Sequence, residues 1–175
     1  MLINLSEIMS VKDKVQHVVV PIEMECFKLD GTEYYFVKKE PVDITITCTG
    51  EREIHLGAST EVSLMLPCSR CLEEVETTFH ILVSKDIRFE ETAQNKSDDG
   101  DELNYIKGYN LDVDILVYDE MLLDFPLKVL CSEDCKGICS VCGKNLNKGT
   151  CDCDRTVGDP RMLKFQDVFK NFKEV

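Results

Sequence analysis

The chain has 175 residues, of which 43% are apolar and 30% charged, and its 33 acidic and 20 basic side chains give a net charge of −13 at pH 7. This composition is that of one folded soluble domain with a modest core, and no apolar run is long enough to cross a membrane. The acidic balance also argues against binding nucleic acid by electrostatic attraction over a broad face.

The first third of the chain predicts antiparallel strands. Apolar and polar residues alternate through residues 18–26 and again through residues 42–48, which is typical of strands with one buried face. Between them, Asp30-Gly31 predicts a two-residue hairpin turn into a strand at residues 34–37. Cys26 and Cys48 occupy apolar positions of these strands, so we expect them to be small core residues.

A further hairpin carries a pair of cysteines at its tip. Alternating apolar residues at 62–66 and 75–83 predict two strands, and Cys68 and Cys71 lie between them. So many short antiparallel strands imply a sheet that curves strongly or closes into a barrel. The predicted fold class is therefore α+β, an antiparallel β-rich domain with a barrel-like or strongly curved sheet, a few helices and a cysteine-rich zinc-binding C-terminal segment.

The second half predicts an acidic loop and two helices. Residues 90–104 are rich in carboxylates and predict a solvated, mobile loop. Apolar residues at spacings of three and four predict a helix over residues 111–123, with Asp112 or Asn110 as its N-cap and Pro126 beyond its end.

A last short amphipathic helix is expected to begin near Asp159. We expect residues 1–127 to form the β-rich domain, and residues 128–175 to form the cysteine-rich segment and this helix, packed on the first part as one unit.

Eight of the ten cysteines lie in motifs typical of zinc ligands. Six fall within residues 131–153, and two more form the CxxC of the hairpin. Four soft thiolates satisfy one zinc ion, and two thiolates a turn apart chelate it with little loop-closure cost. We therefore expect one or two zinc ions and eight ligands, namely Cys68, Cys71, Cys131, Cys135, Cys139, Cys142, Cys151 and Cys153.

Two partitions of these eight cysteines are open. Chelation favours one local site made of Cys139, Cys142, Cys151 and Cys153, which leaves the hairpin pair to meet Cys131 and Cys135. In the other partition the four cysteines from Cys131 to Cys142 form one site, and the hairpin pair meets the CxC at residues 151–153. In both, at least one metal joins the C-terminal segment to the rest of the chain. A structural zinc site can contribute about 10–16 kcal/mol, so the segment should unfold without metal.

Other uses of the cysteines are less well supported. Disulfides need an oxidising compartment, and residues 1–14 have neither the basic start nor the apolar core of an export signal, which favours the reducing cytoplasm. A redox CxxC opens a helix of a βαβ unit, whereas this one links two strands. The C-x3-C-x2-C spacing at residues 135–142 could hold an iron–sulfur cluster, but a radical enzyme needs a large barrel around it. His17, His55 and His80 lie in no catalytic motif.

Charge is distributed unevenly along the chain. Residues 1–127 carry 11 basic and 26 acidic side chains, whereas residues 128–175 carry 9 basic and 7 acidic. An acidic body suits a basic protein partner, and it equally suits simple solubility. Arg70, between two thiolates, is expected to orient the CxxC turn by hydrogen bonding or to reach an RNA phosphate.

Three segments of the chain read, in order, CSRCLEEV, LDVDILVYDEMLLDFPLKVLCSEDCKGICSVCGKNLNKGTCDC and DPRMLKFQDVF. Together they resemble the YceD family of large ribosomal RNA subunit accumulation proteins. The resemblance covers about residues 40–172. It implies a bacterial cytoplasmic protein that supports accumulation of 23S ribosomal RNA and large-subunit biogenesis, and it supplies no catalytic mechanism.

The hypothesis is therefore a non-enzymatic zinc-binding factor whose partner is ribosomal RNA, a basic ribosomal protein or an assembly factor, with neither a membrane nor a small-molecule substrate involved. Two alternatives stay open: a thiol-based redox enzyme that uses the CxxC, and a zinc-dependent protein-interaction adaptor unrelated to ribosomes. An exposed thiolate of low pKa would favour the first. Partner binding that needs metal, without ribosomal RNA, would favour the second.

Overall fold

The computed structural model describes residues 1–10, 13–89, 96–97 and 104–153. The chain divides into two compact units. The first comprises Met1–Leu66 and Val75–Leu127, and the second comprises Pro67–Glu74 and Lys128–Val175. The second unit therefore combines the CxxC turn with the cysteine-rich segment, although about 60 residues separate them in sequence. The expectation that the two predicted parts pack as one unit stays a prediction.

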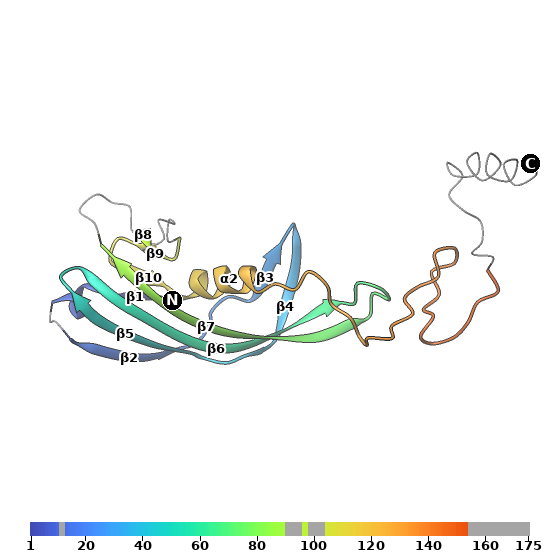
Figure 1. Ribbon diagram of the computed structural model, residues 1–175, viewed down its shortest axis with the longest axis horizontal. Helices are drawn as coiled ribbons and strands as arrows, with labels where there is room; N and C mark the ends of the chain where they lie inside the picture. Colours follow the sequence, from blue (N-terminus) through green and yellow to red (C-terminus); the bar gives the residue numbers. More distant parts are fainter. Residues whose placement is uncertain (11–12, 90–95, 98–103, 154–175) are drawn as a thin grey trace, which may run out of the picture. The chain divides into compact units, whose positions relative to one another are not determined.

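The alternation of apolar and polar residues produces a large antiparallel sheet (Figure 1). In the described part of the chain it has seven strands, and the fold class predicted from the sequence is confirmed as a strongly curved antiparallel sheet with few helices. The strands are β2 (Val15–Val20), β3 (Cys26–Leu29), β4 (Thr32–Lys39), β5 (Val42–Gly50), β6 (Glu53–Pro67), β7 (Glu74–Arg88) and β8 (Lys96–Ser97).

The long strand β6 organises this sheet. Its first half pairs with β5, and its second half pairs with β4 at Phe36↔Leu64. On its other side it pairs with β7, which follows it after the CxxC turn. Side chains alternate between the two faces of these strands. Leu56 and Leu64 of β6 and Ile81 of β7 lie in the core, where each is at most 2% exposed, and the polar positions between them face outward.

The predicted hairpin turn is also confirmed, since Asp30 and Gly31 have φ values of 49° and 80° between β3 and β4.

One predicted strand was wrong in its extent. The alternation through residues 18–26 predicted a single strand, but β2 ends at Val20 and β3 begins only at Cys26. Pro21 has no N–H to give to a strand ladder. Beyond it, the backbone N–H groups of Glu23 and Met24 donate to the Asp114 carboxylate, at 2.8 and 3.0 Å, instead of to a neighbouring strand.

Helix α2 (Val113–Leu123) lies along the concave side of the sheet, as Figure 1 shows. Asp112 caps it by accepting a hydrogen bond from the Ile115 N–H, as predicted. The helix buries Leu116, Val117 and Met121. After its end, Phe125 stacks on Phe27 with ring centroids 5.6 Å apart, so the helix and the sheet share one apolar core.

A second, small sheet closes one end of this unit. Its strands are β1 (Leu2–Asn4), β9 (Ile106–Lys107) and β10 (Asn110–Asp112), and β1 leads into the short helix α1 (Ser6–Met9). Among the described residues, no helix combines the length and apolarity that a membrane span requires. The helix expected from Asp159 and most of the predicted acidic loop at 90–104 lie outside the described residues; Lys96 and Ser97 of that loop form β8.

Candidate metal centre

The second unit gathers eight thiols into two groups of four. All ten cysteines are free thiols. The first cluster consists of Cys68, Cys71, Cys131 and Cys135, and the second cluster consists of Cys139, Cys142, Cys151 and Cys153. Within each cluster all sulfur atoms lie within 4.8 Å of one another. The arrangement matches the partition that chelation favours, and Cys26 and Cys48 lie apart from both clusters.

The sulfur spacing of the first cluster fits a tetrahedral metal. Four thiolates at the usual Zn–S distance of about 2.3 Å form a tetrahedron whose edges are about 3.8 Å long. The Cys68 and Cys135 sulfurs are 3.8 Å apart, and those of Cys71 and Cys131 are 3.5 Å apart. Cys68, Cys71 and Cys135 are buried, whereas Cys131 is exposed.

The CxxC turn that carries two of these thiols is a tight knuckle, here called the first knuckle (residues 68–73). The Leu72 N–H donates to the Cys68 carbonyl at 3.0 Å, and the Cys68 N–H donates to the Glu73 carbonyl at 2.8 Å. Leu72 has a φ of 62°, in the left-handed region that favours glycine. The turn therefore reverses the chain between β6 and β7 with both sulfurs on one side.

The second knuckle (residues 139–144) repeats this structure. The Gly143 N–H donates to the Cys139 carbonyl, and the Cys139 N–H donates to the Lys144 carbonyl, both at 2.9 Å. Gly143 takes a φ of 70°, as its place after the CxxC predicted. CSRCLE and CSVCGK are thus two copies of one local fold, each supplying two thiols to a different cluster.

Side chains and backbone of the second unit fix the loop that brings Cys131 and Cys135 to the first knuckle. The Arg70 guanidinium donates to the Cys135 carbonyl at 2.8 Å and to the Glu133 carbonyl at 3.3 Å, which agrees with the orienting role expected for it. The Ile138 N–H donates to the Arg70 carbonyl at 3.1 Å.

A glycine is required where this loop passes the first knuckle. Gly137 has a φ of 75°, and a Cβ atom there would lie 3.0 Å from the Arg70 carbonyl oxygen. The loop can therefore approach the knuckle closely only because residue 137 has no side chain.

Asn147 holds the first cluster from the other side. Its amide nitrogen donates to the Cys135 sulfur at 3.3 Å, and its side-chain oxygen accepts from the Lys136 N–H at 2.7 Å. The Lys148 ammonium forms an ion pair with Glu73, the last residue of the first knuckle. N–H donors to a sulfur stabilise the thiolate form that binds metal.

These donors change the pKa of individual thiols. Burial raises the pKa of Cys68, but N–H groups of Arg70, Cys71 and Cys131 outweigh it and bring it to about 6. N–H groups of Cys142 and Val141 lower the pKa of Cys139 to about 6 as well. Each cluster therefore holds a thiol whose pKa lies below neutral pH, which favours its thiolate form.

Other thiols of the clusters hold their protons. The Glu73 N–H lowers the pKa of Cys71, but burial and the neighbouring sulfurs raise it to about 12. In the second cluster the Cys142 sulfur is the main cause that raises the pKa of Cys153 to about 12. Several like charges at one point repel one another, so a cation is needed before all four thiols can lose their protons.

Sequence reasoning named every thiol of the two clusters and missed three supporting residues. Gly137, Asn147 and Leu72 carry no ligand atom, so ligand spacing alone could not find them. A comparison of CSRCLE with CSVCGK would have found Leu72, since it aligns with the glycine of the second knuckle.

Comparison with known proteins extends the description. The protein YlbN of Bacillus subtilis (strain 168) is 26% identical over 139 residues, which is 79% of this chain and 72% of the relative. The protein Mb2951c of Mycobacterium bovis is 25% identical over 76 residues, and the match spans 43% of this chain but only 37% of that relative. No solved structure shows significant similarity.

An Arabidopsis thaliana protein named large ribosomal RNA subunit accumulation protein YCED homolog 1, chloroplastic, is 39% identical over 49 residues, which is 28% of this chain and 15% of that protein. The family described as large ribosomal RNA subunit accumulation protein YceD matches residues 56–169. This range contains the first knuckle, helix α2 and all eight cysteines of the two clusters. The chain therefore belongs to the YceD family.

Proposed function

We propose that this protein is a non-enzymatic factor that binds two zinc ions and supports accumulation of 23S ribosomal RNA, and with it assembly of the large ribosomal subunit. The proposal rests on membership of the YceD family and on the name of the Arabidopsis relative. It places the protein in the bacterial cytoplasm, where thiols stay reduced and available to zinc.

The observation that carries the zinc assignment is the geometry of the first cluster. Its sulfurs are spaced as the corners of a tetrahedral zinc site, and all its donors are thiolates, which zinc accepts four at a time. A set of four thiolates leaves no open position for a substrate, so such a zinc is structural rather than catalytic. Each zinc would link loops that are separate in the sequence.

The three histidines support a binding role rather than catalysis. His17, His55 and His80 lie on strands of the large sheet, and each contacts a carboxylate, namely Asp43, Asp86 and Glu61 respectively. The first contact joins β2 to β5, and the other two both join β6 to β7, so each histidine links neighbouring strands of the sheet. We infer that the protein acts by binding RNA, a basic ribosomal protein or an assembly factor.

The test is deletion of the gene, followed by measurement of the 23S to 16S ribosomal RNA ratio and of the ribosome profile on a sucrose gradient. Deletion is expected to lower the ratio and the large-subunit peak. The wild-type gene and a Cys26→Ser variant should restore both, whereas a Cys71→Ser/Cys142→Ser variant, which loses one ligand from each cluster, should not. A profile unchanged by deletion would exclude the proposed function.

A further inference from the structure

The outward face of the large sheet carries an apolar side chain where a polar one is expected. On β7, Ile81 and Val83 point inward and are 2% and 6% exposed, while Leu82 between them is 80% exposed. A leucine at the centre of a strand, on the solvent side, contributes nothing to the core of the unit. Such a side chain gains burial only when another molecule covers this face.

A hollow lies directly beside Leu82. It is formed across β5, β6 and β7, and its walls combine the apolar residues Pro41 and Leu82 with the carboxylates of Glu40, Asp43 and Glu61. Among the described residues that line it, none is an arginine or a lysine. The hollow therefore offers both apolar and acidic side chains to the same occupant.

The charge of this hollow is negative. Lys38 contacts both Glu40 and Glu61, at 2.8 Å each, and its hydrogen bond lowers the pKa of Glu61, which keeps that carboxylate ionised. His17 contacts Asp43 at 2.5 Å, and His80 contacts Glu61 at 3.1 Å. At neutral pH, three carboxylates thus face one permanent cation. The remaining negative charge favours a positively charged occupant.

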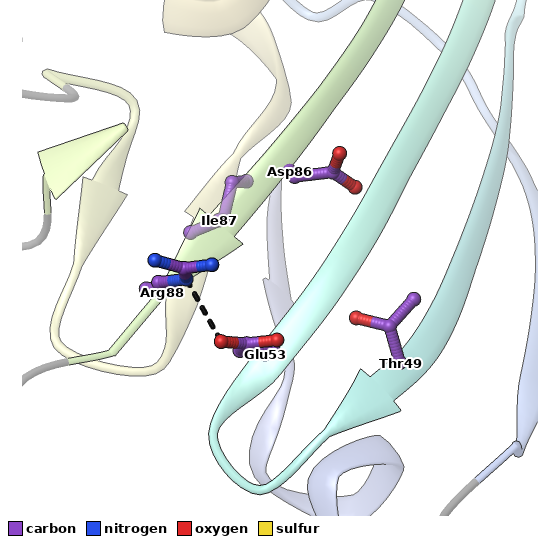
Figure 2. Close-up of a pocket in the computed structure, with 5 residues that line it drawn as sticks. All are labelled: Thr49, Glu53, Asp86, Ile87 and Arg88. Carbon is purple, nitrogen blue, oxygen red and sulfur yellow. Dashed lines mark ion pairs between the residues drawn. The ribbon is translucent and has the colours of Figure 1, made fainter. Parts of the chain in front are cut away.

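A second hollow on the same face shows how such an occupant fits. It lies across the same three strands, between Thr49, Glu53 and Asp86, and the chain's own Arg88 enters it from β7. Arg88 Nε lies 2.8 Å from a Glu53 carboxylate oxygen, and Figure 2 marks this ion pair with a dashed line. The face therefore holds a guanidinium against one outward carboxylate, that of Glu53, while the described residues that line the hollow beside Leu82 offer three carboxylates and no arginine.

We propose that the hollow beside Leu82 binds an arginine side chain from a basic segment of a protein partner. The guanidinium would contact Asp43 and Glu61, and its aliphatic stem would lie against Leu82 and Pro41, a division of contacts that suits arginine better than lysine. The described residues that line the hollow include three carboxylates and neither arginine nor lysine, so the hollow disfavours a phosphate and favours a basic protein over RNA. The inference rests on the proposed function and names the class of partner through which it would operate.

Binding of a fluorescent peptide, in which arginine alternates with valine and serine, tests the proposal by anisotropy with the full-length protein. The Asp43→Asn/Glu61→Gln variant is expected to bind at least about fivefold more weakly than wild type, because two charged contacts are lost. The matched control is Glu53→Gln/Asp86→Asn, which removes the same charge from the second hollow and should change binding less than about twofold. Leu82→Ser should also weaken binding.

Several outcomes would overturn the proposal. Equal weakening by both double variants would mean general attraction to an acidic surface. If a peptide with citrulline in place of arginine binds as tightly as the arginine peptide, the protein does not recognise the charge of the guanidinium group. Tighter binding of a single-stranded RNA probe than of the peptide, lost in the Asp43→Asn/Glu61→Gln variant, would assign the hollow to RNA.

The gene-deletion experiment separates this inference from the proposed function. If deletion leaves ribosomal RNA unchanged, the proposed function fails whether or not the peptide binds. Suppose instead that deletion lowers 23S RNA and that the gene for the Asp43→Asn/Glu61→Gln variant restores it fully. If this variant protein also binds the peptide as tightly as wild type does, only the proposed arginine site fails.

Discussion

Leu72 and Gly143 occupy equivalent positions in two copies of the same knuckle, with φ values of 62° and 70°. The hydrogen bonds that close the two turns are the same, yet one turn uses a residue that disfavours this backbone conformation and the other uses the residue that prefers it. The left-handed conformation costs about 1–2 kcal/mol for a residue with a Cβ atom. The first knuckle therefore holds strain that the second does not.

Substitutions at these two positions should have opposite effects on stability. Leu72→Gly relieves the strain but makes the unfolded chain more flexible, so the free energy of unfolding should stay unchanged or rise by up to about 1 kcal/mol. Gly143→Ala should lower it by about 1 kcal/mol, because only the backbone conformation opposes the new side chain. Urea unfolding of the zinc-loaded variants measures both. A large loss of stability in Leu72→Gly would mean that the leucine packs against another part of the chain.

Gly137→Ala should weaken the proposed zinc binding by the first cluster more than backbone strain alone explains. The new Cβ atom would meet the Arg70 carbonyl oxygen at 3.0 Å, so the loop that carries Cys135 must move away from the first knuckle. We expect a loss of at least about 2 kcal/mol, seen as easier zinc removal by a competing chelator. Gly108→Ala is the matched control, since Gly108 has a similar φ of 63° but open space around it. If the Gly137→Ala and Gly108→Ala variants retain zinc equally well, residue 137 does not lie as close to the Arg70 carbonyl oxygen as described.

The number of zinc ions bound per chain should fall by one for each cluster that loses a cysteine. Elemental analysis should find two zinc ions in the wild type, one in Cys71→Ser, one in Cys142→Ser and none in the double variant, because each cluster supplies four thiolates to one ion. Cys26→Ser should keep both ions, since Cys26 belongs to neither cluster. Loss of both ions from a single variant would show that the two clusters cannot be loaded separately.

Asn147→Ala should make the proposed zinc binding by the first cluster more sensitive to acid. The Asn147 amide is the main cause that lowers the pKa of Cys135, so its removal raises that pKa. Thiolate ligands are lost as the pH falls through their pKa, and a raised pKa moves this loss to higher pH. The midpoint of zinc release in an acid titration should therefore rise by up to about 1 pH unit. Asn110→Ala, which removes an exposed side-chain contact to Asn4 in the first unit, should leave the midpoint unchanged.

Local patterns predicted the local structure well. The alternation through β5 correctly placed Val42, Ile44 and Ile46 in the core, and Asp30-Gly31 correctly predicted a tight turn. The break between β2 and β3 was missed because its cause is partly tertiary. The Asp114 carboxylate that takes the N–H groups of Glu23 and Met24 comes from a helix about 90 residues away.

The grouping of the cysteines could be narrowed but not decided from spacing. Ligand chemistry identified the eight thiols, and chelation favoured the partition found here, yet the alternative satisfied the same spacing rules. The two partitions are distinguished by contacts between segments that are distant in the sequence, such as the hydrogen bonds from the Arg70 guanidinium to the carbonyl groups of Glu133 and Cys135. These depend on where a carbonyl group points, which a one-dimensional pattern does not encode.

The separation of the first cluster into two halves has a consequence for synthesis of the protein. Cys68 and Cys71 are translated about 60 residues before Cys131, so a nascent chain carries two thiols of the first cluster before its other two thiols have been made. A chain that stops before Cys131 can offer zinc only half a site. Metal capture at this position would thus distinguish chains that have been translated past Cys135 from shorter ones.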